Sequence, residues 1–419
     1  MAEVMKSSGI GWVGIIPESW EITRNKYVFY NTKEIVGYKW FDTQLLSLTK
    51  NGVKEKDINE GGGKQPDSFA TYQIVRKNDL VMCLFDLDQS AVFSGLSSYY
   101  GMISPAYKIL KCQNGLDYKY AAYWFDFVFD GRKYKSYSKN IRFTLDYDEF
   151  GKIPIIIPPA NEQKMIADFL DEKCAEIDKL SEDIKKQIGV LEEYKKSVIT
   201  RAVTKGLDPN ARMKESGIEW CNKVPSHWNV KANKYIMSKR KDIQEHYRGE
   251  NILSLTMNGV IVRDLDAGGK MPTTFDGYQK IMPGNLLMCL FDYDVTPRCI
   301  GLIRDEGLTS PAYSQFVLKD GNSARYYYYY YLMIDYTKEL LHLAKNLRHS
   351  FTEEQIGVIK APVPPIAEQE EIANYLDEIC LKIDDSIIGK QEQINGLLDY
   401  KKSIIYEYVT GKKCVKGVN

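Results

Sequence analysis

The feature that most constrains this chain is a long heptad-patterned segment that starts at Pro158 and recurs at Pro364. In the first copy the apolar positions are Ile166, Leu170, Cys174, Ile177, Leu180, Ile184, Ile188, Leu191, Tyr194 and Val198. The eight steps from Leu170 to Val198 average 3.5 residues, which is the period of a coiled coil rather than of an ordinary surface helix. A double proline followed by Glu-Gln predicts the start of a helix, and Gly206 followed by Pro209 predicts its end.

The second copy provides a partner for the first. Equivalent residues are separated by 206 positions, as in Pro158/Pro364, and the block Tyr-Lys-Lys-Ser at 194–197 returns at 400–403. A lone helix of this length with a mostly polar surface needs a partner for its apolar seam. We predict that the two helices pair as an antiparallel coiled coil. The predicted seam residues are Leu170, Ile177, Ile184, Leu191, Leu376, Ile383, Ile394 and Leu397.

The duplication extends over nearly the whole chain. The opening Ser8-Gly9-Ile10 returns at Ser216 with an offset of 208, and Met82-Cys83-Leu84-Phe85-Asp86 returns at Met288 with an offset of 206. A drift of two residues in about 200 indicates a tandem duplication of whole domains and not a solenoid. We predict domains at 1–157 (opening segment 1–22) and 207–363 (linker 207–228), helical spacers at 158–206 and 364–412, and a tail at 413–419.

Each unit mixes short strands with one aromatic-rich helix. Strands are predicted at 45–49, 80–85, 152–157, 286–291 and 358–363, and helices at 118–128 and 324–336. The predicted fold class is α+β. It consists of two homologous mixed α/β domains joined by two long helices under a pseudo-two-fold axis.

Composition excludes several classes of function. Lys plus Arg and Asp plus Glu are equal at 56 each, so a nucleic-acid partner would need a local basic patch. The eight cysteines form no CxxC or Cys/His cluster, so neither a zinc site nor a disulfide framework is indicated. The chain lacks a signal segment and a run of 18 apolar residues, and we expect a soluble, cytoplasmic protein.

Three motifs resemble catalytic signatures but lack the required context. Gly9 to Gly14 match GxGxxG without a preceding strand or a βαβ unit. The double prolines at 158–159 and 364–365 lack the polar residue and the aromatic of an amino-methyltransferase motif. The paired aspartates at 86 and 88, and at 292 and 294, are more typical of turns than of a metal site. We therefore predict no catalytic residue and no metal ligand.

Six consecutive tyrosines, 326–331, permit two interpretations. They could stack on bases, or they could be the bulky inner face of a helix packed on the sheet. The equivalent residues of the first unit, at 120–125, are also bulky, which favours packing.

A basic segment precedes the last strand of each unit. Residues 132–143 contain five basic residues with interleaved aromatics and no acid, and the pattern Lys-Asn-x-Arg recurs at 139–142 and 345–348. Such a segment suits phosphate contacts by Lys and base-edge contacts by Asn and Arg, although a solvated basic loop is the plain alternative. The candidate DNA-binding residues are Lys64, Lys139, Asn140, Arg142, Lys270, Lys345, Asn346 and Arg348.

Each of the two domains opens with Ser-Gly-Ile-x-Trp and Ile/Val-Pro-x-x-Trp and enters a long helix through Pro-Pro-x-x-Glu-Gln. In these motifs the chain resembles the specificity subunit of type I restriction-modification systems. The resemblance covers essentially the whole chain. It implies two target-recognition domains that each read one half of a split, asymmetric DNA sequence. It also implies two methyltransferase subunits and two restriction subunits as partners.

On this resemblance the chain itself carries no cofactor. S-adenosylmethionine, ATP and Mg would bind to the partner subunits, and the length of the helices would set the gap between the two half-sites. A methyltransferase or nuclease activity in this chain is the alternative, and a coiled-coil assembly protein that does not bind DNA is a third possibility.

Overall fold

The computed structural model describes residues 4–57, 66, 68–139, 142–267, 272–344 and 349–415. The chain forms two compact units, residues 1–184 with 392–419 and residues 185–391. Each unit therefore holds one globular domain, the first half of its own long helix and the last half of the other one. This exchange of helix halves follows from how the two long helices pack against each other.

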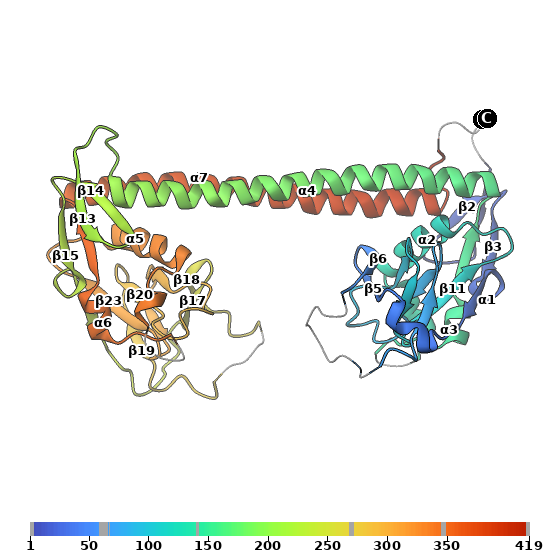
Figure 1. Cartoon of the computed structure of the whole chain (residues 1–419), viewed down its shortest axis with the longest axis horizontal. Coiled ribbons are helices and arrows are strands. Elements are labelled where there is room, and N and C mark those ends of the chain that lie inside the picture. Colours follow the sequence, from blue (N-terminus) through green and yellow to red (C-terminus); the bar gives the residue numbers. More distant parts are fainter. Residues whose placement is uncertain are drawn as a thin grey trace. The chain divides into compact units, whose positions relative to one another are not determined.

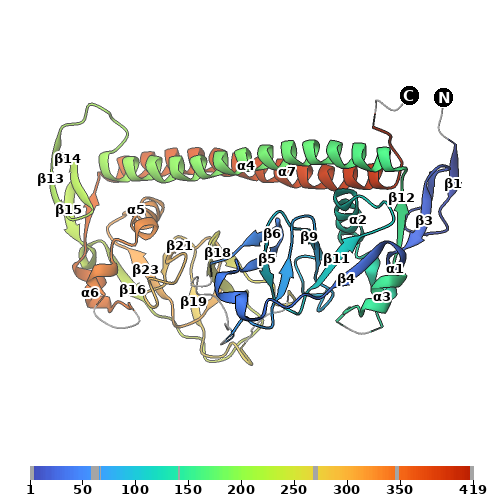
Figure 2. The ribbon, with the colours of Figure 1, turned by 45° about the vertical axis from the view of Figure 1, so that its right-hand side comes forward.

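The long helices have the bounds that the sequence indicates. They are α4 (Ala160–Lys205) and α7 (Ile366–Val409), and both views show them side by side (Figures 1 and 2). The aromatic-rich helices are α2 (Tyr118–Asp130) and α5 (Ala324–Thr337). The short helices are α1 (Asn25–Val28), α3 (Tyr147–Lys152) and α6 (Glu353–Val358), with 3-10 turns η1 (Gly37–Asp42), η2 (Lys133–Tyr137), η3 (Asn233–Tyr235) and η4 (Leu341–Leu343).

The described strands match one another between the units. In the first unit they are β1 (Met5–Ser7), β2 (Ile15–Pro17), β3 (Glu21–Arg24), β4 (Phe29–Thr32), β5 (Leu46–Thr49), β6 (Gly52–Glu55), β7 (Gln73–Val75), β8 (Leu80–Met82), β9 (Ser94–Leu96), β10 (Gly101–Ile103), β11 (Lys108–Cys112) and β12 (Pro154–Ile157). In the second they are β13 (Met213–Ile218), β14 (Cys221–Pro225), β15 (Asn229–Ala232), β16 (Met237–Arg240), β17 (Leu253–Thr256), β18 (Gly259–Val262), β19 (Gln279–Ile281), β20 (Leu286–Met288), β21 (Ile300–Leu302), β22 (Gly307–Thr309), β23 (Ser314–Leu318) and β24 (Lys360–Val363).

Each domain is built around a four-stranded antiparallel sheet. The strand order is β4-β11-β8-β9 in the first unit and β16-β23-β20-β21 in the second. The last strand before each long helix pairs instead with an early strand, β12 with β3 and β24 with β15. The beginning and the end of each domain are thereby joined where the long helix starts.

The segment that matches GxGxxG is a β-turn region and not a nucleotide loop. It connects the antiparallel strands β1 and β2, and Gly9 and Gly14 have φ angles of +67° and +79°. The strand–loop–helix context that pyrophosphate binding requires is absent from this described segment.

The helix pair is an antiparallel coiled coil in each unit. In the first, the Phe169 and Tyr408 rings lie 4.4 Å apart, and Asp178 accepts a hydrogen bond of 2.7 Å from Lys401 Nζ. In the second, Lys195 Nζ donates to Asp384 at 2.6 Å. The Lys-Asp pairs 195/384 and 401/178 are equivalent under the 206-residue repeat.

The predicted seam residues are mostly shielded from solvent. Six of the eight predicted residues are buried, namely Leu170, Ile177, Ile184, Leu376, Ile383 and Ile394. The other two, Leu191 and Leu397, are half-buried. Two of the apolar positions in the sequence pattern were wrong. Leu180 and Tyr194 are each 50% exposed, and Ser181 is buried instead. Strict alternation of four-residue and three-residue steps places residues 181 and 195 in the seam, whatever their hydrophobicity.

The six tyrosines belong to the core and not to a base-stacking surface. Five of them are buried in the second domain. Their hydroxyls tie α5 to its surroundings, since Tyr326 donates to the Val203 carbonyl at 3.0 Å and Tyr327 to the Pro362 carbonyl at 3.0 Å. A buried tyrosine needs such a partner for its hydroxyl, and here the partners lie on α4 and β24.

Candidate nucleic-acid interface

The basic segment of the first unit is anchored at both ends against the end of β8. Tyr134 is buried, and its hydroxyl donates to the Leu87 carbonyl at 3.0 Å. At the other end, the Leu145 amide donates to the Leu84 carbonyl at 2.7 Å, and Thr144 Oγ1 accepts from the Asp86 amide at 3.0 Å. Among the described residues between these anchors, Lys139 and Arg142 are exposed at the surface.

The turn that holds the paired aspartates lies under this segment. Asp86 has a φ angle of +47°, which aspartate tolerates in turns. Its carboxylate lies 3.6 Å from Arg142 Nη1, and the Asp88 carboxylate lies 3.3 Å from Arg132 Nη1 and 3.9 Å from Lys135 Nζ. These aspartates therefore pair with the basic segment, which the sequence reading did not connect with them.

Arg142 is the most available of these cations. Its side chain is 81% exposed, and Lys139 is also exposed. An exposed ion pair contributes only about 0–1 kcal/mol. The guanidinium can therefore leave Asp86 for a phosphate or a guanine edge at little cost.

Lys133 belongs to the same segment but has a structural role. Its Nζ donates to the Phe127 carbonyl at 2.9 Å and lies 4.0 Å from the centre of the Phe127 ring. Burial lowers the pKa of this ammonium group. One of the five basic residues in the predicted segment is therefore directed into the domain.

The second unit repeats the anchor with other side chains. The Phe351 amide donates to the Leu290 carbonyl at 2.7 Å, as Leu145 does to Leu84. His349 Nδ1 lies 3.0 Å from the Asp294 carboxylate, where the first unit has Arg132 beside Asp88. The predicted contact residues Lys64, Asn140, Lys270, Lys345, Asn346 and Arg348 lie outside the described residues.

A second set of contacts fixes each domain to the helix pair, and we call it the helix clamp. In the first unit it consists of Trp20, Lys119, Tyr120 and Tyr123 of the domain with Glu162, Gln163 and Asp171 of α4. Trp20 Nε1 donates to Glu162 Oε2 at 2.9 Å, and Asp171 accepts from Lys119 at 2.6 Å and from Tyr123 at 2.8 Å. The hydrogen bond to Asp171 raises the pKa of Lys119.

The clamp also reaches the far end of the other long helix. The buried Tyr120 hydroxyl donates to the Ile156 carbonyl at 2.8 Å and contacts the Val409 carbonyl at 3.1 Å. Gly411, with a φ angle of +67°, lies so close to Pro17 and Trp20 that a Cβ atom there would clash. The start of the chain therefore packs against the C-terminal end of α7.

The second unit has the same clamp at equivalent positions, with Arg325 in place of Lys119 and Ser323 in place of Asp117. Trp228 Nε1 donates to Glu368 at 2.9 Å, and Asp377 accepts from Arg325 at 2.8 Å and from Tyr329 at 2.7 Å. Gln369 accepts from the Ser323 amide at 2.8 Å, as Gln163 accepts from Asp117 at 2.7 Å.

The helix clamp was missed from the sequence. The motifs Ile/Val-Pro-x-x-Trp and Pro-Pro-x-x-Glu-Gln were noticed separately, yet the structure joins the tryptophan of one to the glutamate of the other in both units. Their shared recurrence was the available signal, although recurrence alone does not specify a contact.

The described residues give no metal site and no membrane span. Among them, no three His, Cys, Asp or Glu side chains are grouped so that they could hold a metal ion. Within the same part of the chain, no helix combines the length and apolar character needed to cross a bilayer.

Comparison with known proteins shows what the chain is similar to. Residues 103–189 match the family described as the type I restriction modification DNA specificity domain. The type I restriction enzyme MjaVIII specificity subunit of Methanocaldococcus jannaschii is 24% identical over 96% of this chain and 95% of its own length. The putative type I restriction enzyme MjaX specificity subunit of the same organism is also 24% identical, over 96% of each chain.

The fold has a solved counterpart. A chain from a structural study of complex assembly and conformational transition of the type I R-M system superposes with a TM-score of 0.68 at 11% identity, covering 95% of this chain and 99% of that one. At this identity the likeness establishes the fold alone. The matched family domain and the two relatives aligned over nearly their full length show that this chain is similar to the specificity subunits of type I restriction-modification systems.

Proposed function

We propose that this chain is the non-catalytic DNA-reading subunit of a type I restriction-modification complex, and that each domain reads one half of a bipartite target. The observation that carries this proposal is the exposed loop around Arg142, which rests on an anchored edge of the sheet and is held by weak surface ion pairs. To bind phosphates, the cations of this surface must leave the aspartates with which they pair. Cations that are loosely paired on a firmly anchored segment suit this exchange.

The two half-sites should differ. The helix clamp is the same in both units, whereas the edge that carries the loop has Arg132 beside Asp88 in one unit and His349 beside Asp294 in the other. A shared framework with different edge side chains predicts an asymmetric target.

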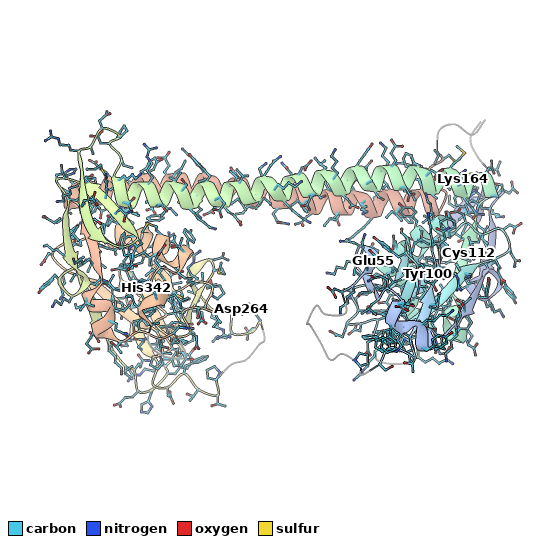
Figure 3. All side chains as sticks on the ribbon, viewed as in Figure 1. Glu55, Tyr100, Cys112, Lys164, Asp264 and His342 are labelled. Carbon is cyan, nitrogen blue, oxygen red and sulfur yellow. The ribbon has the colours of Figure 1, made fainter. Side chains whose placement is uncertain are left out.

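The long helices offer two equivalent docking surfaces for methyltransferase subunits. Lys402 of α7 lies 3.4 Å from Asp130. The equivalent residue of α4, Lys196, lies over the Tyr336 ring. This position of each long helix therefore faces a domain. Tyr194 and Tyr400 lie two residues earlier, about 200° around the helix, and are 50% and 56% exposed. Charged residues such as Lys164 also project from the helices (Figure 3).

Two repeat-related surfaces support the binding of two methyltransferase subunits. These subunits would carry S-adenosylmethionine, and two restriction subunits would use ATP and Mg. Tyr194→Asp and Tyr400→Asp should each weaken capture of one methyltransferase subunit without changing the folding of the chain. Thr200→Asp, at an exposed position about 240° around the helix from Tyr194, is the matched control. Unchanged methyltransferase stoichiometry in the double variant would reject this surface.

DNA reading is tested with the reconstituted methyltransferase complex. We expect protection or methylation of a split target, together with a loss of affinity as salt rises because phosphate contacts release counterions. Methylation or cleavage by the purified chain alone, supplied with the cofactors, would instead support the enzymatic alternative.

A further inference from the structure

One buried position of the sheet edge differs in chemistry between the two units. In the first, Phe93 stacks on Phe129 at 5.7 Å and on Tyr134 at 5.5 Å. The equivalent residues 206 positions later are Cys299, Asp335 and Leu340. An aromatic stack is thus replaced by a thiol and a carboxylate in the same place of the same fold.

The carboxylate belongs to a buried ionic cluster. Asp335 is 4% exposed, and it accepts hydrogen bonds from Lys338 Nζ at 2.6 Å and from the Cys299 amide at 2.9 Å. Arg298 Nε lies 3.9 Å away. Burying such charges offsets much of what their pairing contributes, and the aromatic stack of the first unit fills this position without them. The cluster is therefore not required by the fold.

Beside the cluster, two thiols lie opposite each other at the adjoining ends of two paired strands. Continuing the register of β20 and β21 pairs residue 289 with residue 299, and the Cys289 amide donates to the Cys299 carbonyl at 2.9 Å. Directly opposed residues of an antiparallel pair place their side chains on the same face. Their Cα atoms are typically about 5.5 Å apart, which is within the range that a disulfide spans.

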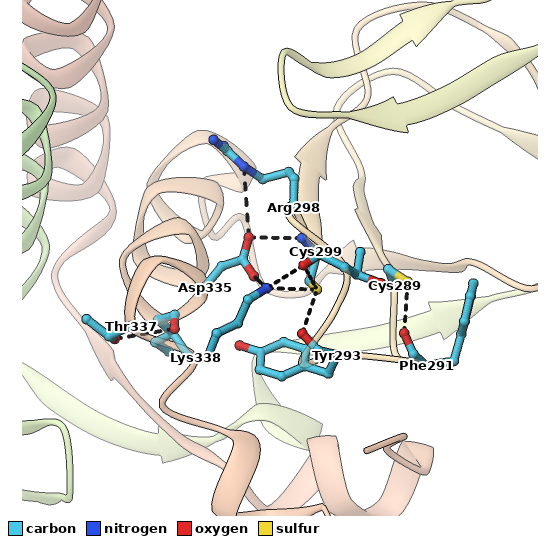
Figure 4. Close-up of polar contacts among 10 residues, drawn as sticks. Cys289, Phe291, Tyr293, Arg298, Cys299, Asp335, Thr337 and Lys338 are labelled. Atoms are coloured by element: carbon cyan, nitrogen blue, oxygen red, sulfur yellow. Dashed lines mark hydrogen bonds and ion pairs between the residues drawn. The ribbon is translucent and has the colours of Figure 1, made fainter. Parts of the chain in front are cut away.

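A cation lies beside this pair. Lys338 Nζ is 3.3 Å from Cys299 Sγ, and Figure 4 shows it between Asp335 and Cys299. Hydrogen bonding with Cys299 lowers the pKa of Cys289 to about 7 and raises that of Cys299. Cys289 is therefore the more acidic of the two thiols, and the Lys338 ammonium group opposes part of the rise in the pKa of Cys299.

We propose that Cys289 and Cys299 form a peroxide-sensitive dithiol that closes reversibly to a disulfide in the second recognition domain. The bond would close the loop between the two residues, which carries the Asp294 partner of His349. The first unit lacks this device, because Cys83 faces Phe93 at the equivalent position.

The chemistry balances with hydrogen peroxide as the oxidant. One thiolate attacks a peroxide oxygen, becomes a sulfenic acid and releases hydroxide, which takes up a proton to give water. The second thiol then attacks that sulfur, forms the S–S bond and expels a second water. Two thiols and one peroxide thus yield one disulfide and two waters, and a dithiol reductant reverses the change.

The test uses the full chain carrying Cys414→Ser, because Cys414 is exposed and would form intermolecular disulfides. After peroxide treatment, denaturation and alkylation, mass spectrometry should find Cys289 and Cys299 joined in one unalkylated linked peptide and Cys83 alkylated. Reduction should restore alkylation of both. Equal alkylation of Cys83, Cys289 and Cys299 after peroxide would overturn the proposal.

A matched pair of variants tests the cation. Lys338→Gln should slow disulfide formation by roughly tenfold, since it removes the charge that helps Cys299 lose its proton when the S–S bond forms. Arg132→Gln changes the equivalent residue of the first unit and should leave the rate unchanged. Equal rates in both variants would show that Lys338 does not activate the pair.

Discussion

Arg142 and Lys133 belong to one basic segment, but only one of them can turn to a ligand. Arg142 is exposed and loosely paired with Asp86, whereas Lys133 is bound to a carbonyl and an aromatic ring. Charge in the sequence does not distinguish these two states. The distinction comes from what packs around each side chain.

Arg142→Ala should therefore weaken or relax recognition of one half-site by about 1–3 kcal/mol, the typical value of a good base contact. The measurement is the methylation rate of the reconstituted complex on matched targets and on targets with a single mismatch. Lys133→Met is the control and should leave these rates unchanged. By analogy, Arg348→Ala should affect the other half-site. Unaltered methylation in both arginine variants would refute the assignment of these loops.

The helix clamp gives a second prediction at the residue scale. Glu162→Ala removes the acceptor of the buried Trp20 indole and should lower the free energy of unfolding by about 1–3 kcal/mol. Glu368→Ala should cost at least as much, because Glu368 accepts from both His227 and Trp228. Glu193→Ala, which changes an exposed glutamate, is the control for urea denaturation. If the Glu162→Ala and Glu193→Ala variants have the same free energy of unfolding, the clamp does not stabilise the domain.

At the scale of elements, the sequence predicted the four longest helices and five of the described strands. The heptad period gave both long helices, and the turn residues bounded the strands. The predicted apolar pattern was wrong at Leu180 and Tyr194, which are exposed. Each is the apolar neighbour of the residue that the strict heptad places in the seam. The helix clamp could not be predicted, because a contact between residues 142 positions apart leaves no local periodicity.

Ser181 provides a test of the seam. It is 6% exposed, its hydroxyl has no hydrogen-bond partner in the described structure, and its equivalent in α7 is Ile387. Removing an unsatisfied buried hydroxyl should stabilise the protein, so Ser181→Ala should raise the free energy of unfolding by about 1 kcal/mol. Ser197→Ala, on the exposed face, should have little effect. A destabilised Ser181→Ala variant would contradict this packing.

At the scale of the whole molecule, neither unit is a simple segment of the chain. Each contains its domain and one half of each long helix. The repeat predicted two related domains. It could not predict that a compact unit would divide both helices, because that division depends on which residues pack together.

The helices should also set the gap of the target. Deleting seven residues from each, 185–191 and 387–393, preserves the heptad register and shortens each helix by about 10 Å, or about three base pairs of DNA. We expect the gap in the methylated sequence to shorten. A deletion of 185–191 alone, which breaks the seam, should abolish methylation. An unchanged gap in an active double deletion would reject helix length as the determinant.

The central claim is that this chain alone determines where the complex methylates, through two different half-sites. The most direct measurement is methylome sequencing of a host that carries its methyltransferase subunit, with this chain intact, with Arg142→Ala, or absent. The account predicts adenine methylation at one asymmetric, split sequence, with Arg142→Ala altering one half only and no methylation in the absence of the chain. Methylation that persists without the chain, or an uninterrupted or palindromic target, would contradict it.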